Sequence, residues 1–189
     1  MKILALSSAI VMLAGTAAAD EFRPALEAYL EAELRGWIND PVLVAAIKEQ
    51  NTRTMGFSSA DIDQLDREWR DGLASGSSDI VDDVLRNPAA DFLRSRVEES
   101  EGAITEAFTM DAIGLNVSAS SATSDYWQGD EAKFQKTFGL GAGSVHYSEI
   151  EFDESSQTYQ GQVSVVIVDP SNNEAIGAIT IGINAESLL

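Results

Sequence analysis

The sequence contains no cysteine and a single histidine, His146, among its 189 residues. Disulfide bonds, thiol catalysis and transition-metal sites built from several His and Cys ligands are therefore excluded. Basic residues are also scarce, because 12 Lys and Arg stand against 31 Asp and Glu, which gives a formal net charge of −19. Such a charge repels nucleic acid and anionic membrane surfaces, so we expect neither as a partner.

The sequence also lacks an apolar run of the roughly 20 residues that are needed to cross a bilayer. One shorter apolar run, residues 3–13, follows Lys2 and precedes small residues that end in Ala17-Ala18-Ala19. This pattern is typical of a secretory signal peptide with an Ala-x-Ala cleavage site. We therefore expect residues 1–19 to be removed, and residues 20–189 to form one soluble periplasmic domain that does not insert into the membrane.

Residues 20–100 are predicted to be helical because their apolar side chains recur at helical spacing. Asp40-Pro41 and Ser58 are typical of helix starts, and the Gly- and Ser-rich residues 72–78 indicate a flexible break. On the third helix we expect Trp69 in the core and the Asp66–Arg70 pair in solvent. The predicted helices are 21–39, 42–51, 60–73, 79–86 and 88–99.

Residues 101–189 are predicted to form strands, since apolar residues alternate or run continuously between turn signals. The first two strands flank a turn that is closed by Gly114, and the last three form a meander. The fold class is therefore α+β: an antiparallel sheet of about five strands, with the long N-terminal helices on one face and a loop and short helix, 130–138, on the other. The predicted strands are 104–110, 116–121, 145–152, 159–168 and 175–184.

The loop at residues 120–130 surrounds the pair Tyr126-Trp127 with hydroxyl, amide and carboxylate side chains. Rings shape a cavity and a few polar groups orient a ligand, so this mixture indicates a small-molecule pocket, in which we expect the rings to dominate affinity. The alternative is an ordinary surface loop whose rings lie over the edge of the core. The candidate ligand-binding residues are Asn116, Ser118, Thr123, Ser124, Asp125, Tyr126, Trp127, Gln128 and Lys133.

Lys133 lies on the predicted short helix, where its side chain can face either the loop or solvent. If it faces the loop, it would pair with an anionic group on the ligand, which favours a small carboxylate or zwitterion over a simple cation.

Three segments resemble the PAS-like, extracytoplasmic Cache sensor domains: FTMDAIGLNV at 108–117, TSDYWQGDEAK at 123–133 and IGAITIG at 176–182. The resemblance implies a stand-alone periplasmic sensor that binds a small molecule between the sheet and the loop and helix that cover it. It also implies a membrane sensor kinase or chemoreceptor as signalling partner, because no kinase or methyl-accepting domain accompanies these segments. The Arg-x-Trp-Tyr signature of the amino-acid-binding subgroup is not found, so that specificity is not implied.

Catalysis is not expected, because His146 has no accompanying GxSxG turn and no cofactor motif is found. The glycines at 139–143 lack the GxGxxG spacing of a phosphate-binding loop. Acidic clusters at Asp125/Asp130/Glu131 and Asp153/Glu154 lack the periodicity of a calcium loop, and we expect no metal there. The alternatives left open are a secreted hydrolase that uses the loop carboxylates Asp125 and Asp130, and a structural protein of the envelope.

Overall fold

The computed structural model describes residues 18–76, 78–153 and 157–189. The predicted signal peptide, residues 1–19, lies almost wholly outside the described residues and stays a prediction. Ser77 in the predicted break, the middle of the predicted turn at 153–157 and Glu154 of one calcium candidate also lie outside them. In the part that is described, no helix is both long and apolar enough to cross a bilayer.

Five helices precede the sheet, and side chains in the sequence set where several of them begin. The Asp40 side chain accepts a hydrogen bond from the backbone N–H of Val42, and Ser58 and Asp61 form a reciprocal capping box. Both helix starts confirm the sequence prediction. The helices are α1 (Ala18–Tyr29), continued by a π-helical turn (Leu30–Leu34), α2 (Pro41–Thr54), α3 (Ser59–Ser75), α4 (Asp79–Leu85) and α5 (Pro88–Glu99).

The predicted break at residues 72–78 begins too early in the sequence. Helix α3 continues through Gly72 to Ser75, and Gly76 caps its C-terminus. Gly76 has a left-handed φ of 78°, which a glycine adopts without strain. Gly72 is needed for packing instead: a Cβ atom there would lie 2.4 Å from the Cβ of Ser78. The glycine therefore allows α4 to fold back against α3.

One antiparallel sheet contains all the described strands, in the order β2-β1-β6-β5-β3, and β4 pairs with the far part of β5. The predicted strand 145–152 is divided into two. At the break, the backbone N–H of Gln162 donates to the Ser148 hydroxyl instead of to a backbone carbonyl of the neighbouring strand. The strands are β1 (Ile104–Met110), β2 (Asn116–Ala119), β3 (Val145–Tyr147), β4 (Glu151–Asp153), β5 (Thr158–Val168) and β6 (Ala175–Asn184).

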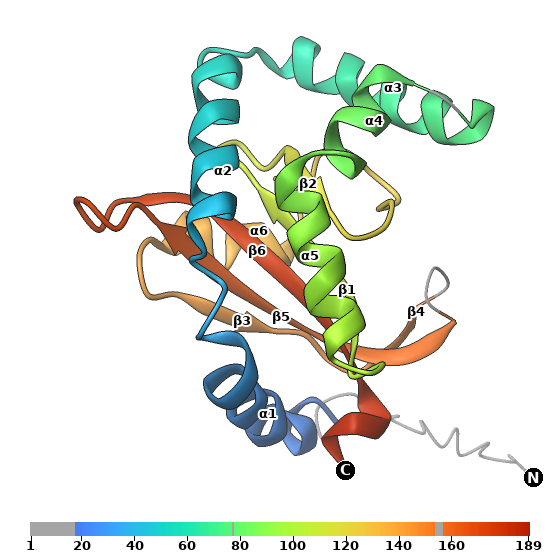
Figure 1. Ribbon diagram of the computed structural model, residues 1–189, viewed down its shortest axis with the longest axis vertical. Coiled ribbons are helices and arrows are strands. Elements are labelled where there is room, and N and C mark those ends of the chain that lie inside the picture. Colours follow the sequence, from blue (N-terminus) through green and yellow to red (C-terminus); the bar gives the residue numbers. More distant parts are fainter. Residues whose placement is uncertain (1–17, 77, 154–156) are drawn as a thin grey trace, which may run out of the picture.

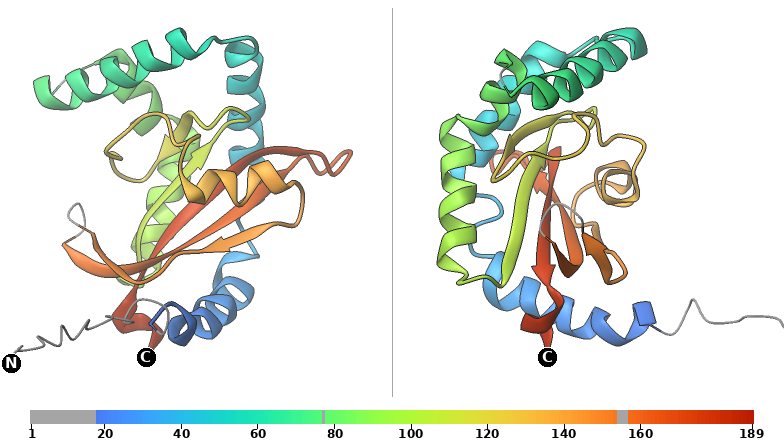
Figure 2. Two further views of the ribbon diagram at one scale, coloured as in Figure 1. Left: turned by 180° about the vertical axis from the view of Figure 1, so that it is seen from behind. Right: turned by 90° about the vertical axis from the view of Figure 1, so that its right-hand side faces the viewer.

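The sheet separates two layers that differ in kind (Figure 2). Helices α2 and α5 cover one face, while the loop after β2 and the short helix α6 (Ala132–Gln135) cover the other. Helix α1 lies near the C-terminus at one end of the sheet, and α3 and α4 lie at the opposite end (Figure 1). The α+β class and PAS-like arrangement predicted from the sequence are confirmed.

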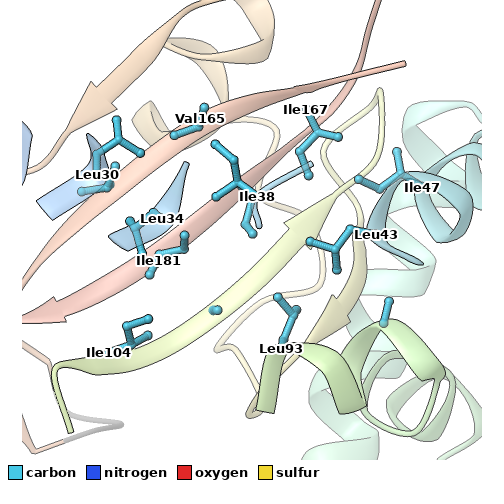
Figure 3. Packing of buried hydrophobic residues seen from close by; sticks show 14 of the residues in the cluster. Leu30, Leu34, Ile38, Leu43, Ile47, Leu93, Ile104, Val165, Ile167 and Ile181 are labelled. Atoms are coloured by element: carbon cyan, nitrogen blue, oxygen red, sulfur yellow. The ribbon is translucent and has the colours of Figure 1, made fainter. Parts of the chain in front are cut away.

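The main core lies between the sheet and the helices, where branched aliphatic side chains from both layers interlock (Figure 3). Each fully buried Leu, Ile or Val contributes about 1.5–3 kcal/mol by leaving water. The labelled members are Leu30, Leu34, Ile38, Leu43, Ile47, Leu93, Ile104, Val165, Ile167 and Ile181.

A second apolar cluster lies on the other face and includes Trp69, Phe108, Tyr126 and Phe134. Trp69 is fully buried, as predicted, and its indole N–H donates to the Thr123 carbonyl at 2.9 Å. Its ring stacks on Tyr126 with 5.7 Å between the centroids. Helix α3 is thereby attached to the loop that the sequence identified as a candidate site.

Candidate functional site

Helix α3 holds the candidate loop by its backbone. The Asp66 Oδ1 accepts the backbone N–H groups of Tyr126 at 2.9 Å and Trp127 at 3.1 Å. Arg70 then bridges Asp66 and Asp125, at 2.5 and 3.0 Å. The prediction that the Asp66–Arg70 pair is solvated surface charge is therefore wrong for Asp66, because the loop folds back over this side of α3 and needs an acceptor for two N–H groups.

The rings of Tyr126 and Trp127 point into the protein body. Tyr126 is 7% exposed and stacked on Trp69, and the Trp127 indole N–H donates to the Ile113 carbonyl at 2.9 Å. Leu115 forms an isolated β-bridge with Trp127, which ties the loop to the turn after β1. Both rings therefore fix the course of the loop, and neither lines the cavity between the loop and the sheet.

That cavity has a volume of ≈ 380 Å³, within the range of small-molecule sites. A second hollow of ≈ 620 Å³ continues from it along β3 and β4, and the two share Lys133, Asp153 and Gln162. Four of the predicted site residues line the inner cavity: Thr123, Ser124, Gln128 and Lys133. The other lining residues are Leu73, Glu106, Phe108, Ala122, Asp153 and Gln162.

Lys133 faces the loop, which decides between the two orientations that the sequence left open. Its side chain is 18% exposed, and the ammonium lies 5.4 Å from the centroid of the Phe108 ring on the sheet. The ammonium also donates to Gln128 Oε1 at 3.2 Å and pairs with Glu131 at 3.0 Å. A largely buried cation at the cavity wall can bind an anionic group with little competition from water.

Glu106 is a cavity residue that the sequence reasoning missed. It is 9% exposed, and its Oε1 accepts from the side-chain amides of Gln160 at 2.9 Å and Gln162 at 3.1 Å. Gly182 stands opposite it on β6, where a Cβ would lie 2.6 Å from Gln160 Oε1. The available signal was a glutamate inside an otherwise apolar strand, together with glutamines at alternate positions of β5, because buried charges and amides of this kind need partners.

Of the remaining predicted polar residues, Asn116 and Asp125 hold the loop, whereas Ser118 pairs with a neighbouring strand. Asn116 is fully buried, and its amide donates to the Thr123 hydroxyl at 2.7 Å and to the Asp125 carbonyl at 3.0 Å. The Ser118 hydroxyl pairs with that of Thr109 at 2.7 Å. Asp125 is held by Arg70, as described above. The structure thus brings four predicted residues together at the cavity. Asn116, Asp125 and the two rings hold the loop instead, and Ser118 lies within the sheet.

His146 lies on β3 at the wall of the outer hollow. Burial, and then the nearby Lys136 and Arg23, lower its pKa, so its imidazole is neutral near pH 7. Asp130, the second carboxylate of the hydrolase alternative, is exposed and lines neither hollow. Within the described ranges, no group of three His, Asp or Glu side chains is arranged to hold a metal ion.

The solved structures to which this chain is similar include three sensor or ligand-binding domains. The sensor domain of the histidine kinase DctB from V. cholerae matches 90% of this chain at 15% identity, with a TM-score of 0.48. The sensory domain of the Campylobacter jejuni chemoreceptor Tlp3 with isoleucine bound matches 88% at 12% identity, with a TM-score of 0.42. The ligand-binding domain of the Pseudomonas aeruginosa PAO1 amino acid chemoreceptor PctC, in complex with GABA, matches 92% at 10% identity, with a TM-score of 0.41.

The chain spans 55%, 64% and 59% of the length of these three domains, respectively. The sequence itself matches no profile of a known protein family and no curated protein. The fold predicted from the sequence, an antiparallel sheet with helices on one face and a loop with a short helix on the other, agrees with the strand order and the layers described above.

Proposed function

We propose that this protein is a sensor domain that binds a small polar solute between the sheet and the loop with α6. The observation that carries the proposal is the pair of nearly buried, opposite charges at one cavity: Lys133 on α6 and Glu106 on β1. A carboxylate has about four acceptor positions, of which the two glutamines use two, so Glu106 has capacity for donors on a ligand.

The ligand class that suits these walls is a zwitterion, or a small carboxylate that also carries hydroxyl groups. Lys133 would bind the carboxylate, and Glu106 would accept from an ammonium or hydroxyl group. Thr123, Ser124, Gln128 and Gln162 would orient the molecule by hydrogen bonds. A charge-assisted hydrogen bond contributes roughly 1.5–3 kcal/mol, which exceeds the effect of screened surface charges beyond about 8 Å.

Export to the periplasm and reporting to a membrane sensor kinase or chemoreceptor complete the proposal. The signal-peptide pattern of residues 1–19 supports the location, and the resemblance to stand-alone Cache proteins supports the class of partner. A catalytic role has no such support. Asp125 is paired with Arg70, and neither carboxylate of the hydrolase alternative is among the residues that line the inner cavity.

The test is a thermal-shift screen of zwitterions, small carboxylates and polyamines, followed by calorimetry on the best ligand. Lys133→Met and Glu106→Gln are each expected to weaken binding by about 10-fold to 100-fold. Lys136→Met is the matched control, because Lys136 lines only the outer hollow and its substitution should leave affinity unchanged.

Two results would overturn the assignment. Stabilisation by polyamines alone would contradict the ligand class. Undiminished affinity in both cavity variants, or an equal loss in Lys136→Met, would place the ligand outside the inner cavity.

A further inference from the structure

We propose that the groove between α2, α3 and α4 binds a basic, amphipathic helix of a partner protein. The groove is a hollow of ≈ 760 Å³ framed by residues of these helices, and Val117 of β2 and Tyr126 of the loop lie at its floor. Figure 1 shows the three helices at the end of the molecule where α3 crosses above the loop. This groove rests on the proposed function and extends it, since it would be the surface through which the sensor contacts its signalling partner.

The floor of the groove is mainly apolar, although the buried Gln50 and Thr54 of α2 also line it, and its walls remain partly open. Val84, Val117 and Tyr126 form the buried floor, while Leu65 and Ile80 are half-buried on the walls. Phe57, at the mouth, is 38% exposed. Uncovered aliphatic and aromatic groups in one concave strip match the apolar stripe of an amphipathic helix.

The rim of the groove is acidic, which favours a partner whose contacting surface is positively charged. Four exposed carboxylates, Glu49, Glu68, Asp79 and Asp83, stand among the described residues that line it, against a single base. That base, Arg53, is already paired with Glu49 at 2.5 Å.

A second copy of this chain is disfavoured at the groove, because each copy carries a formal charge of −19, and an anionic lipid surface is disfavoured for the same reason. Lysine or arginine beside an apolar stripe satisfies both the rim and the floor. Helix α2 has 14 residues and is about 21 Å long, so the partner helix needs a similar length.

The loop connects this groove with the solute cavity. Thr123, Ser124 and Gln128 line the cavity, whereas Tyr126, two residues after Ser124, lies at the floor of the groove. A solute that displaces the loop would therefore also displace Tyr126 at the floor of the groove.

The test uses a fluorescent leucine–lysine peptide of about 14 residues, designed as an amphipathic helix, in about 0.15 M salt. Binding is measured by anisotropy, without solute. A peptide of the same composition in scrambled order, which has no apolar stripe, is the peptide control. We expect the amphipathic peptide to bind at least about tenfold more tightly than the scrambled one.

Two double variants test the site with equal changes in net charge. Glu68→Lys with Asp83→Lys reverses the rim and is expected to weaken binding by about tenfold or more. Asp63→Lys with Asp71→Lys reverses two exposed carboxylates of α3 that do not line the groove, and should change affinity less than about twofold.

No binding of the amphipathic peptide, equal binding of the scrambled peptide, or equal weakening by both double variants would overturn the groove assignment. Lys133→Met separates this result from the proposed function, because it removes the solute contact and leaves the groove intact. A protein that binds solute but not the peptide refutes only the groove, and the reverse result refutes only the solute site.

Discussion

The two faces of the sheet are built from the same strands but from different kinds of side chain. Toward α2 and α5, β5 and β6 present buried valines and isoleucines, such as Val163, Val165, Ile179 and Ile181. Toward the loop, the intervening positions of these strands include Gln160, Gln162, Ser164 and Thr180. The apolar face supplies the burial that drives folding, while the polar face turns hydrogen-bonding groups toward the loop, where we propose that a solute binds.

The covers of the two faces differ in the same way. Helices α2 and α5 bury apolar side chains such as Leu43, Ile47 and Leu93, whereas the cover of the polar face is a loop and the four-residue helix α6. Asp66 and Asn116 fix that loop mainly through hydrogen bonds to its backbone and to Thr123. We expect a cover held in this way to open at a lower free energy than a packed helical layer, which would let a solute enter without global unfolding.

The largest expected effect is on the apolar face. Leu93→Ala, in the fully buried core, should lower the free energy of unfolding by about 2–5 kcal/mol, because it removes packed methyl groups and leaves a cavity. Gln162→Ala on the polar face should cost only about 1 kcal/mol, since Gln160 still donates to Glu106. Urea unfolding measures both. Equal losses would contradict the division of roles between the faces.

The next effect concerns the turn between β1 and β2, which approaches the loop at Gly129. Gly114 has a φ of 86°, and a Cβ there would lie 2.6 Å from the Gly129 Cα, where only backbone could yield. Gly114→Ala should destabilise the protein by about 1–3 kcal/mol through backbone strain, as measured by thermal unfolding. Gly139→Ala is the control, because nothing lies within 4 Å of its added methyl group. A Gly114→Ala variant as stable as this control would show that the turn is not constrained.

A smaller and more local effect is expected at Asp66. Asp66→Ala leaves the N–H groups of Tyr126 and Trp127 without their acceptor, so exchange of these two amides should quicken by about 10-fold or more. Asp63→Ala, an exposed position on the same helix, should leave both rates unchanged. Hydrogen exchange followed by NMR or mass spectrometry distinguishes the two. Unchanged exchange in Asp66→Ala would mean that the loop is held by its rings instead.

The smallest effect is a pH dependence at the edge of the helical layer. The Lys48 ammonium, and then hydrogen bonds from Ser171, lower the pKa of Asp169 from 3.8 to about 2. Because the folded pKa lies below the unfolded one, the contact stabilises the fold above about pH 4, and this stabilisation is lost as the pH falls toward 2. The stability difference between the native protein and Asp169→Asn should therefore shrink from about pH 5 to pH 2 in denaturant titrations. A difference that stays constant with pH would exclude this ion pair as its source.

The sequence predicted the features that depend on neighbouring residues. Asp40 and Ser58 cap helices through contacts two or three residues away, and the alternation in β1, β5 and β6 reflects a local backbone geometry. The features that it missed depend on residues far apart in the chain. Asp66 meets Tyr126 across 60 positions, and Glu106 meets Gln160 across 54, so no spacing rule along one element could bring them together.

The same limit explains the mixed outcome for the candidate site. Position on the loop correctly selected Thr123, Ser124, Gln128 and Lys133 as neighbours of one cavity. Position on the loop does not predict the direction of each side chain, because that direction depends on α3, which packs against the loop from the other side. Tyr126 faces α3 and Trp127 faces the turn after β1. The aromatic pair that suggested a pocket therefore supports the loop and does not line the cavity.

The attachment of the loop through its backbone has a consequence for how the protein can diversify. Asp66 contacts N–H groups that every amino acid except proline carries, so the attachment does not depend on the identity of the attached residues. Ser124, a cavity residue on the same loop, can therefore be exchanged without loss of these two hydrogen bonds. We expect homologous sequences to lack proline at positions 126 and 127, because proline has no N–H group to donate to Asp66.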